Sequence, residues 1–581
     1  MIAKPIVKLF DKPILRSGWI QVAVAGLAAA SLWASPVWGQ SGLTRDEVLR
    51  LPPPLQAAAA DYGAVRCAAT PLAASLPGEL PIGSLDALAF DGVTVLPFTE
   101  LYQLAFPQTR QPVTREGLGR LATALECRYR ELGYVFARVV VVPDPSGEPN
   151  RYRVTVTEGI VQRVEALAAN EALANLALRA FTPVREGQPL QAADVRRGLS
   201  QAASVGLTDV RPTIRRSRLD PAAVDLVLVV GGTPDQFIFS GQNGNSEALG
   251  PYGVLAGLRV GGLTPLAERS SVGVYAATES REQWSVQLES EALLTGQGLR
   301  ARWGGAYSRA HPGAVLAPLE VDAKTLYLVA ELSRPVAVRR GLLVAARGGL
   351  EAVDQRTLFL GGLPLGNDRS RVGYLGLRAD GLLDNGVWSA DLQVRRGLAA
   401  LGSSRAGSSE LSRADADPAA TALRLDADFG RQLTRSITLR GTLRAQWSDR
   451  PLLAFERISF GGLNGGPGFD PGAMVGDSGV AATLQLFLPS LALGTASLRP
   501  FVQVAGARFE STGEQAENAS GAAVAAGVQG SLGRSWQVQA MWAEPVGGIV
   551  GVSPDAYRGR FLLSITGAFD WRREPVGGEF R

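Results

Sequence analysis

Few side chains in this sequence have the types and spacing that catalysis needs. Its 581 residues contain one histidine, His311, in Ala310-His311-Pro312-Gly313, a stretch typical of an exposed loop tip. Nucleophilic catalysis needs a base held beside a serine or cysteine, which a solvated loop histidine does not provide. No cysteine–histidine cluster has metal-site spacing, and no phosphate-binding motif occurs. We therefore expect no enzymatic activity, no cofactor and no bound metal.

Two acidic pairs have the spacing of one strand face rather than of acid–base catalysis. Glu289 and Glu291, like Asp426 and Asp428, stand two positions apart in alternating segments. A period of two puts both carboxylates of a pair on the same side of a strand. We interpret them as charges that line a water-filled interior. The net charge of +4, without a basic run interleaved with aromatics, does not indicate nucleic-acid binding.

The segments that carry these charges alternate apolar and polar residues across residues 236–571, which we interpret as about sixteen strands. In Ile437–Trp447, one face carries leucines and Trp447, and the other carries Arg440, Arg444 and Gln446. An apolar face with aromatics, opposite a polar face, is typical of a transmembrane barrel with lipid outside and water inside. Such strands must close into a barrel, because hydrocarbon offers no partner for backbone polar groups. A large soluble all-β protein is the alternative.

Connection lengths predict the orientation of the barrel. Several connections are short turns, such as Leu383-Asp384-Asn385-Gly386, which contains the Asn-Gly hairpin signal. The longer connections are expected around 311–323, 352–370, 397–419, 448–479 and 545–558. Outer-membrane barrels have short periplasmic turns and long external loops, so this barrel should begin and end in the periplasm.

The N-terminus has the pattern of an export signal. Lysines and Arg16 precede an apolar stretch from Trp19 to Trp33, and small residues then favour cleavage before Gln40. Residues 1–39 are therefore expected to be a signal peptide, although a retained membrane anchor is the alternative. Residues 40–83 are rich in proline and alanine and indicate a linker, in which Arg45–Leu51 could form a short helix.

The chain has two cysteines, Cys67 and Cys127. In an oxidising periplasm they could pair and tie the linker to a helix of the following module. Two independent thiols are the alternative, since Cys127 falls on an amphipathic segment and could be a core residue.

Two similar β-α-α-β-β modules are predicted before the barrel. The first covers 84–160, with strands at Leu88–Phe90, Tyr134–Val142 and Tyr152–Val156 and helices at Phe98–Phe106 and Arg115–Leu132. The second covers 161–232, with strands at Val161–Leu167, Val210–Arg215 and Val224–Val230 and helices at Asn170–Phe181 and Gln191–Ser204. Repetition of one unit indicates an internal repeat. The barrel should occupy 233–571 and a tail 572–581.

Two such modules followed by a sixteen-strand barrel resemble the outer-membrane transporters of two-partner secretion, the haemolysin secretion/activation proteins, whose modules are POTRA domains. The resemblance is carried by Gly133-Tyr134-Val135, Glu158-Gly159, Glu456–Gly462, Gly468-Phe469 and Gly476–Gly479. It implies that 448–479 is the sixth external loop, which folds back into the lumen. The implied lumen-loop residues are Gly461, Gly462, Gly466, Pro467, Gly468 and Phe469. The implied cargo-binding region of the first module contains Gly133, Tyr134, Val135, Glu158 and Gly159.

The sequence departs from the family pattern at two positions. Pro467 stands where the loop arginine is expected, and Ala505 stands where an inward aspartate of the thirteenth strand is expected. Removing one partner of a buried ion pair costs about 3–5 kcal/mol, whereas replacing both can be neutral. We therefore expect the loop to enter the lumen and to be held by backbone contacts, by packing of Phe469 and by the inward Gln503.

The resemblance implies export of a large, β-rich partner exoprotein without nucleotide hydrolysis. The modules would bind the extended chain, the lumen would pass it, and the barrel assembly machinery would insert the barrel into outer-membrane lipid. A barrel-assembly factor of the same superfamily is one alternative, although such proteins generally carry more periplasmic modules. A passive solute porin is the other, although a porin would not need the modules.

Overall fold

The computed structural model describes residues 80–570 except 106–111, 169–170, 206, 208–209, 232–234, 265, 267, 278–281, 340, 514–517 and 534. The expected signal peptide, most of the linker including Cys67, and the tail lie outside the described residues. The chain divides into two compact units at residues 232–233.

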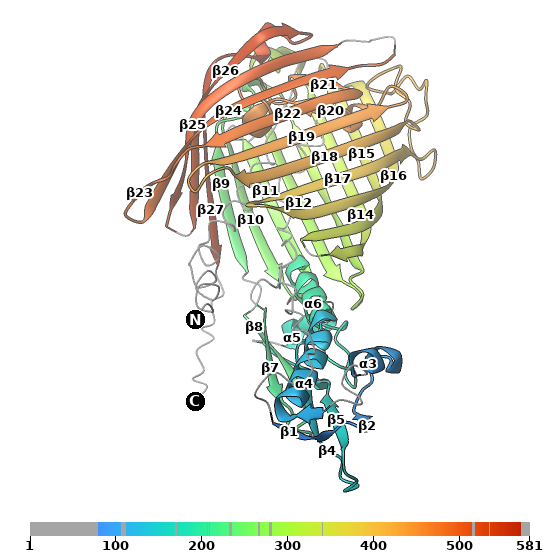
Figure 1. The fold of residues 1–581 in the computed structure, drawn as a ribbon. Coiled ribbons are helices and arrows are strands. Elements are labelled where there is room, and N and C mark those ends of the chain that lie inside the picture. The colour runs from blue at the N-terminus through green and yellow to red at the C-terminus, as the bar shows by residue number, and fades with distance from the viewer. Residues whose placement is uncertain are drawn as a thin grey trace. The chain divides into compact units, whose positions relative to one another are not determined.

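The first module packs two helices on a three-stranded sheet (Figure 1). It contains β2 (Ala87–Asp91), α3 (Phe98–Ala105), α4 (Arg115–Glu131), β4 (Arg138–Pro143) and β5 (Arg151–Thr157), with sheet order β2-β5-β4. A small ribbon of β1 (Pro81–Ser84) and β3 (Pro112–Thr114) was not predicted. Thr114 caps α4 by accepting a hydrogen bond from the Gly117 amide. Leu121, Leu125 and Tyr129 of α4 are fully buried against the sheet.

The second module repeats this arrangement. It contains β6 (Ile160–Leu167), α5 (Glu171–Ala180), α6 (Ala192–Ser204), β7 (Val210–Arg216) and β8 (Ala223–Val230), with sheet order β6-β8-β7. The β8 strand lies in the middle of the sheet and buries Leu226 and Leu228 completely. The two modules therefore share the predicted β-α-α-β-β order.

A closed antiparallel barrel of sixteen strands follows, with a short extra strand at one hairpin. Its strands are β9 (Gln236–Gln242), β10 (Gly253–Gly261), β11 (Arg269–Ala277), β12 (Gln283–Leu293), β13 (Arg300–Ala310), β14 (Asp322–Arg339), β15 (Leu342–Phe359), β16 (Leu363–Leu383), β17 (Gly386–Gly397), β18 (Thr421–Gln432), β19 (Thr438–Ser448), β22 (Ser478–Phe487), β23 (Leu491–Leu493), β24 (Ala496–Glu510), β25 (Ala519–Leu532), β26 (Trp536–Val550) and β27 (Arg560–Asp570). The β27 strand pairs with β9, so the sheet has no free edge.

The two faces of the wall differ as the alternation predicts. Large apolar side chains point outward and stay exposed, for example Leu288 at 55%, Leu375 at 73% and Trp447 at 57%. Polar side chains such as Gln287 and Arg440 point inward and are buried. An apolar belt outside and a polar interior satisfy a bilayer on one side and water on the other.

Three predicted boundaries are wrong. The connection expected at 545–558 covers only 551–559, because β26 continues to Val550. The expected long connection at 352–370 is a three-residue turn, because β15 continues to Phe359 and β16 starts at Leu363. The turn uses left-handed backbone at Leu360 and Gly361. The sequence Gly361-Gly362-Leu363-Pro364, which spans the turn and the start of β16, has the composition of a loop. The fourth element of the first module begins at Arg138 rather than Tyr134, since Gly133, with φ of +92°, ends the preceding helix in a turn.

Candidate functional site

The connection between β19 and β22, residues 449–477, is folded into the barrel. It contains the short strands β20 (Ile458–Phe460) and β21 (Met474–Gly476), which pair with each other, and one helical turn, α7 (Gly462–Gly465). Phe469 and Met474 have no exposed surface, and Phe455 is 1% exposed. A loop lying outside the barrel would expose such side chains. We call residues 449–477 the lumen loop, and residues 461–470 its tip.

Glycines shape the tip. Gly461, Gly462 and Gly468 have φ values of +135°, +82° and +94°. A Cβ at Gly461 would lie 2.0 Å from the Asp470 carbonyl oxygen, so the close approach of the two tip segments requires glycine. The Gly462 amide then donates to the Phe469 carbonyl at 2.9 Å, which closes the tip on itself.

The base of the lumen loop is tied to the barrel wall by a buried ionic cluster. The Arg395 guanidinium of β17 is 1% exposed, and it donates to Glu456 of the loop at 3.0 and 3.1 Å. Its Nη2 atom also donates to Glu351 of β15 at 2.6 Å. The ring of Tyr374 lies 5.5 Å from the Arg395 guanidinium carbon. Two carboxylates thus share one arginine, and all three side chains are buried, so a missing partner is costly.

The end of the lumen loop is fixed by Asp477, which has no exposed surface. Its carboxylate accepts hydrogen bonds from Arg413 Nη1 at 2.8 Å, from the Leu452 amide at 3.0 Å and from the Thr512 amide at 2.9 Å. These donors come from two external connections and from the start of the loop itself. Asp477 therefore joins the extracellular ends of several strands.

The tip packs on a wall of small side chains. Phe469 belongs to a buried cluster with Ala505, Ala523 and Phe509, and its ring lies 5.9 Å from that of Tyr557. Gly521 of β25 leaves room for it, because an added Cβ would lie 2.9 Å from the Phe469 Cζ atom.

One ion pair accompanies this packing, with its charges opposite to those the resemblance led us to expect. Asp470 of the tip lies 2.7 Å from Nη1 of Arg560, the first residue of β27. Arg560 also donates to the Phe469 carbonyl. The Asp470 amide donates to the Ala556 carbonyl at 2.7 Å, and the Arg558 amide donates to the Gly468 carbonyl at 2.9 Å. The acid is therefore on the loop and the arginine on the wall.

Of the two expected wall residues, Ala505 packs against the lumen loop, whereas Gln503 is hydrogen-bonded within the wall itself. Ala505 contacts the tip through the apolar cluster that contains Phe469. Gln503 accepts a hydrogen bond from Gln485 Nε2 at 2.7 Å, and within the described part of the chain it makes no hydrogen bond to the lumen loop. Thr483 on the neighbouring strand instead donates to the Gly465 carbonyl at 3.1 Å.

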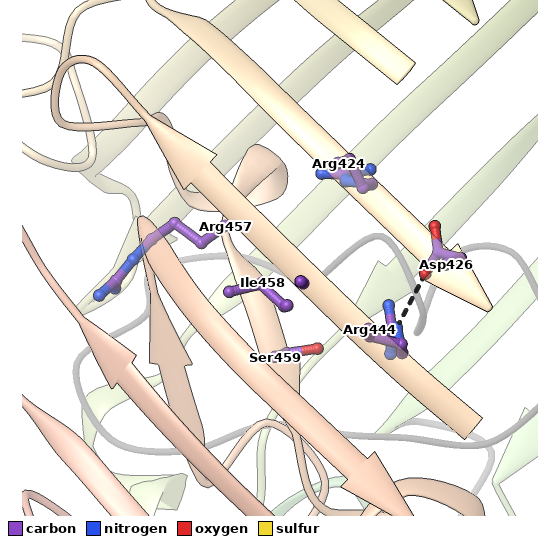
Figure 2. Close-up of a pocket in the computed structure, with 7 residues that line it drawn as sticks. Arg424, Asp426, Arg444, Arg457, Ile458 and Ser459 are labelled. Atoms are coloured by element: carbon purple, nitrogen blue, oxygen red, sulfur yellow. Dashed lines mark ion pairs between the residues drawn. The ribbon is translucent and has the colours of Figure 1, made fainter. Parts of the chain in front are cut away.

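Two stretches of wall therefore hold the lumen loop by different chemistry. The charged wall is the inward face of β15–β19, with Arg347, Glu351, Asp391, Arg395, Arg424, Asp426 and Arg444. The small-residue wall is the inward face of β24–β26, with Ala505, Gly521, Ala523, Ala525 and Ala543. Figure 2 shows Arg424, Asp426 and Arg444 of the charged wall beside Arg457, Ile458 and Ser459 of the lumen loop, which together line a pocket.

In the first module, the residues that the resemblance implied for cargo binding mostly stabilise the module itself. Glu158 is 3% exposed and accepts hydrogen bonds from the Thr94 and Val95 amides and from the Tyr129 hydroxyl at 2.6 Å. Burial raises the pKa of Glu158, but these hydrogen bonds outweigh it and hold the pKa below its ordinary value. Gly159, with φ of +71°, leads into the second module. The Glu158 carboxylate is therefore buried inside the first module, with its hydrogen bonds made to that module's own groups.

The remaining predicted residues are half-buried in the first module or lie outside the described residues. Gly133, Tyr134 and Val135 form the turn after α4, and the Ala192 amide of the second module donates to the Gly133 carbonyl at 2.9 Å. Cys127 lies half-buried on α4, and its pairing with Cys67, which is outside the described residues, stays a prediction.

Comparison with known proteins supports the resemblance in both units. Residues 346–530 match the model of the family described as haemolysin secretion/activation protein ShlB/FhaC/HecB, and residues 84–159 match the model of the ShlB-type POTRA domain. The hemolysin transporter protein ShlB of Serratia marcescens is 31% identical over 139 residues, which is 24% of this chain and 23% of that protein. The match thus spans about a quarter of the relative.

Two solved structures share the fold over most of their length. CdiB from Escherichia coli superimposes with a TM-score of 0.69 at 18% identity, covering 86% of this chain and 93% of its own. CdiB from Acinetobacter baumannii gives 0.63 at 14% identity, covering 88% and 95%. The resemblance stated from the sequence is therefore confirmed, and with it the outer-membrane location of the barrel and the periplasmic location of the modules.

Proposed function

We propose that this chain exports a large partner exoprotein across the outer membrane by two-partner secretion. The observation that carries the proposal is a polar lumen that holds a folded-in loop, whose base and tip are held by different forces. A passive porin does not need a loop tied into its lumen at both ends. A transport role also accounts for the lumen carboxylates as pore lining and ion-pair partners rather than as catalytic acids and bases.

The periplasmic modules are proposed to capture the unfolded exoprotein. The β4 strand is at the edge of its sheet, and its Val140 and Val142 are 55% and 38% exposed. An extended chain can add to such an edge by backbone hydrogen bonds, which requires little sequence specificity. Captured segments would then enter the lumen, and the emerging β-rich protein would fold outside.

The tip of the lumen loop is the proposed moving part. It is held by apolar contacts with the small-residue wall, by one ion pair and by a few backbone hydrogen bonds. The base is held by the Arg395 cluster and by Asp477, both of which are almost completely buried. Because separating a buried ion pair costs more than separating a partly exposed one, the tip should leave its wall first.

The experiment compares the secreted and outer-membrane proteins of the native organism with and without this gene. Loss of one or a few large exported proteins, with other barrels unchanged, is the expected result. A general fall in many barrels would overturn the proposal in favour of barrel assembly, and no change in either fraction would favour a passive pore. Complementation with the intact gene and with a variant lacking residues 84–160 would separate cargo capture from passage through the barrel.

A further inference from the structure

Two arginines near the periplasmic end of the lumen, Arg440 and Arg499, differ from most other inward arginines of the barrel in their lack of a carboxylate partner among the described residues. Most inward arginines have a carboxylate partner: Arg302 lies 2.9 Å from Glu289, Arg347 lies 3.1 Å from Glu331 and Arg378 lies 3.1 Å from Asp380. Arg440 of β19 and Arg499 of β24 have no carboxylate within ion-pair distance among the described residues. Both lie next to the short periplasmic turns that end at Thr438 and Ala496.

The two arginines meet over one aromatic ring. The guanidinium carbon of Arg440 lies 4.6 Å from the centre of the Phe487 ring, and that of Arg499 lies 5.2 Å from the same centre. Phe487 is 2% exposed and Arg440 is 7% exposed. An aromatic face attracts a cation, but it carries no net charge and cannot neutralise two guanidinium groups. Arginine also cannot lose its proton to relieve the repulsion.

The hydrogen bonds around the pair leave this positive charge in place. Arg499 donates to neutral acceptors, the Leu488 carbonyl at 3.2 Å and the Thr438 hydroxyl at 2.6 Å. Gln485 faces Arg440 across β19 and β22, and it donates its amide to the Gln503 oxygen. The Gln503 Nε2 atom is buried and finds no acceptor among the described residues. In the register of the wall Arg440 pairs with Gln485 and Gln485 with Gln503, so the two cations and the unused donor come from the neighbouring strands β19, β22 and β24.

We propose that Arg440, Arg499 and Gln503 form a binding site for carboxylate anions at the periplasmic mouth of the lumen. A carboxylate there would gain charge-assisted hydrogen bonds from the guanidinium groups and would neutralise the local charge. The low-dielectric wall concentrates the positive field at this point, which favours entry of anions over cations. The site depends on the geometry of the lumen alone, so it stands or fails independently of the export proposal.

Two sources could supply the carboxylate, a small free acid or the acidic side chains of a polypeptide. The test titrates the detergent-solubilised full chain with hexaglutamate, with hexaglutamine as the uncharged peptide and with acetate as the free acid, all at one ionic strength. We expect heat of binding with hexaglutamate and none with hexaglutamine. Binding of hexaglutamate without acetate would assign the site to a polypeptide, and binding of acetate as well would assign it to carboxylates in general.

Variants locate the binding at this pair. Losing two charge-assisted contacts in Arg440→Gln/Arg499→Gln should weaken hexaglutamate binding by about tenfold or more. Arg378→Gln/Asp380→Asn, which removes a paired arginine together with its acid, should leave it unchanged. Arg440→Lys/Arg499→Lys keeps the charge and should retain most of the binding, which guards against misfolding of the glutamine variant. Equal binding by wild type and a folded glutamine variant, or no carboxylate binding by wild type, would overturn the proposal.

Discussion

The charged wall and the small-residue wall face the same lumen loop but hold it in opposite ways. On the charged wall, Arg395 and Glu456 form a buried pair that also engages Glu351. On the small-residue wall, the ring of Phe469 lies against alanines and a glycine, and Asp470–Arg560 is the accompanying ion pair. Among the described inward side chains of β22 and β24–β27, the charged ones are Arg499 and Arg560. The difference indicates a fixed base and a releasable tip.

The base should be harder to release than the tip, because breaking a buried ion pair costs more free energy than breaking an apolar contact. A buried ion pair adds little net stability when it forms, yet losing one partner leaves an uncompensated charge in a dry place. Apolar contact with small residues has no such penalty, because the ring can leave without stranding a charge. A wall of alanine and glycine also presents a smooth surface along which an extended chain could slide.

Replacing Arg395 by methionine should have the largest effect on the barrel. It leaves Glu351 and Glu456 buried without their shared cation, at a cost of about 3–5 kcal/mol. The free energy of unfolding by urea, followed by tryptophan fluorescence in detergent, measures the loss. Arg508→Met is the matched control, since Arg508 and Glu510 are 76% and 57% exposed and such surface pairs contribute about 0–1 kcal/mol. Equal stability of the two variants would contradict a fixed base.

Phe469→Ala should loosen the tip. Removing a fully buried phenylalanine ring costs about 3 kcal/mol, at the low end of measured values because the tip can relax into the lumen. The loss should appear as faster proteolysis within residues 461–470, while the rest of the barrel stays resistant. Leu401→Ala, at a leucine that is 74% exposed in an external connection, is the control. A tip as resistant as that of the control would show that packing of Phe469 does not hold it.

The Asp470–Arg560 pair should contribute less than the packing of Phe469. Asp470→Asn weakens one charge-assisted contact, at about 1.5–3 kcal/mol, since both groups are partly exposed. A double-mutant cycle with Arg560→Gln, measured by the same proteolysis, isolates the coupling between the two side chains. The exchange Asp470→Arg/Arg560→Asp puts the arginine on the loop and should recover part of the loss. Additive single effects would mean that the pair does not act as a unit.

Gly521→Ala should have the smallest effect. The added methyl group would lie 2.9 Å from the Phe469 ring and 3.2 Å from Met474, so the ring must shift, at about 1 kcal/mol. Proteolysis of the tip should be slightly faster. Gly506→Ala, whose new Cβ would have no neighbour closer than 3.5 Å, is the matched control. Equal rates of tip proteolysis in the two alanine variants would show that packing of Phe469 does not require glycine at position 521.

Most of the fold could be predicted because each part has a local signal. Alternation in Ile437–Trp447 and its equivalents predicted the wall, and the apolar spacing of Leu118, Leu121 and Leu125 predicted α4. The connection at 352–370 was misjudged because its glycines occupy a tight turn at the end of two long strands. Periodicity along one strand does not show how far a hairpin extends beyond the membrane.

The loop contacts could be predicted only in part. The resemblance placed the loop, and burial of Phe469 was expected. The Asp470–Arg560 pair was missed, because its partners are ninety positions apart and the family pattern directed attention to Pro467 and Ala505. Glu456 and Asp477 were within the quoted motif, but their partners Arg395 and Arg413 lie on other strands and loops. A single sequence does not show which inward arginine faces which loop acid.

The most direct test of the fixed base and releasable tip is a reversible disulfide in the tip. Phe469 and Tyr557 are paired across an isolated bridge, so cysteines at both positions, with Cys67 and Cys127 replaced by serine, can tie the tip to the connection between β26 and β27. Ser459→Cys/Val475→Cys, which joins β20 to β21 within the loop, is the control. We predict that the oxidised disulfide between positions 469 and 557, the tip lock, prevents the exoprotein from appearing outside the cell. Reductant should restore export. The control disulfide between positions 459 and 475 should leave export unchanged. Export at the control level with the tip lock fully oxidised would contradict the account.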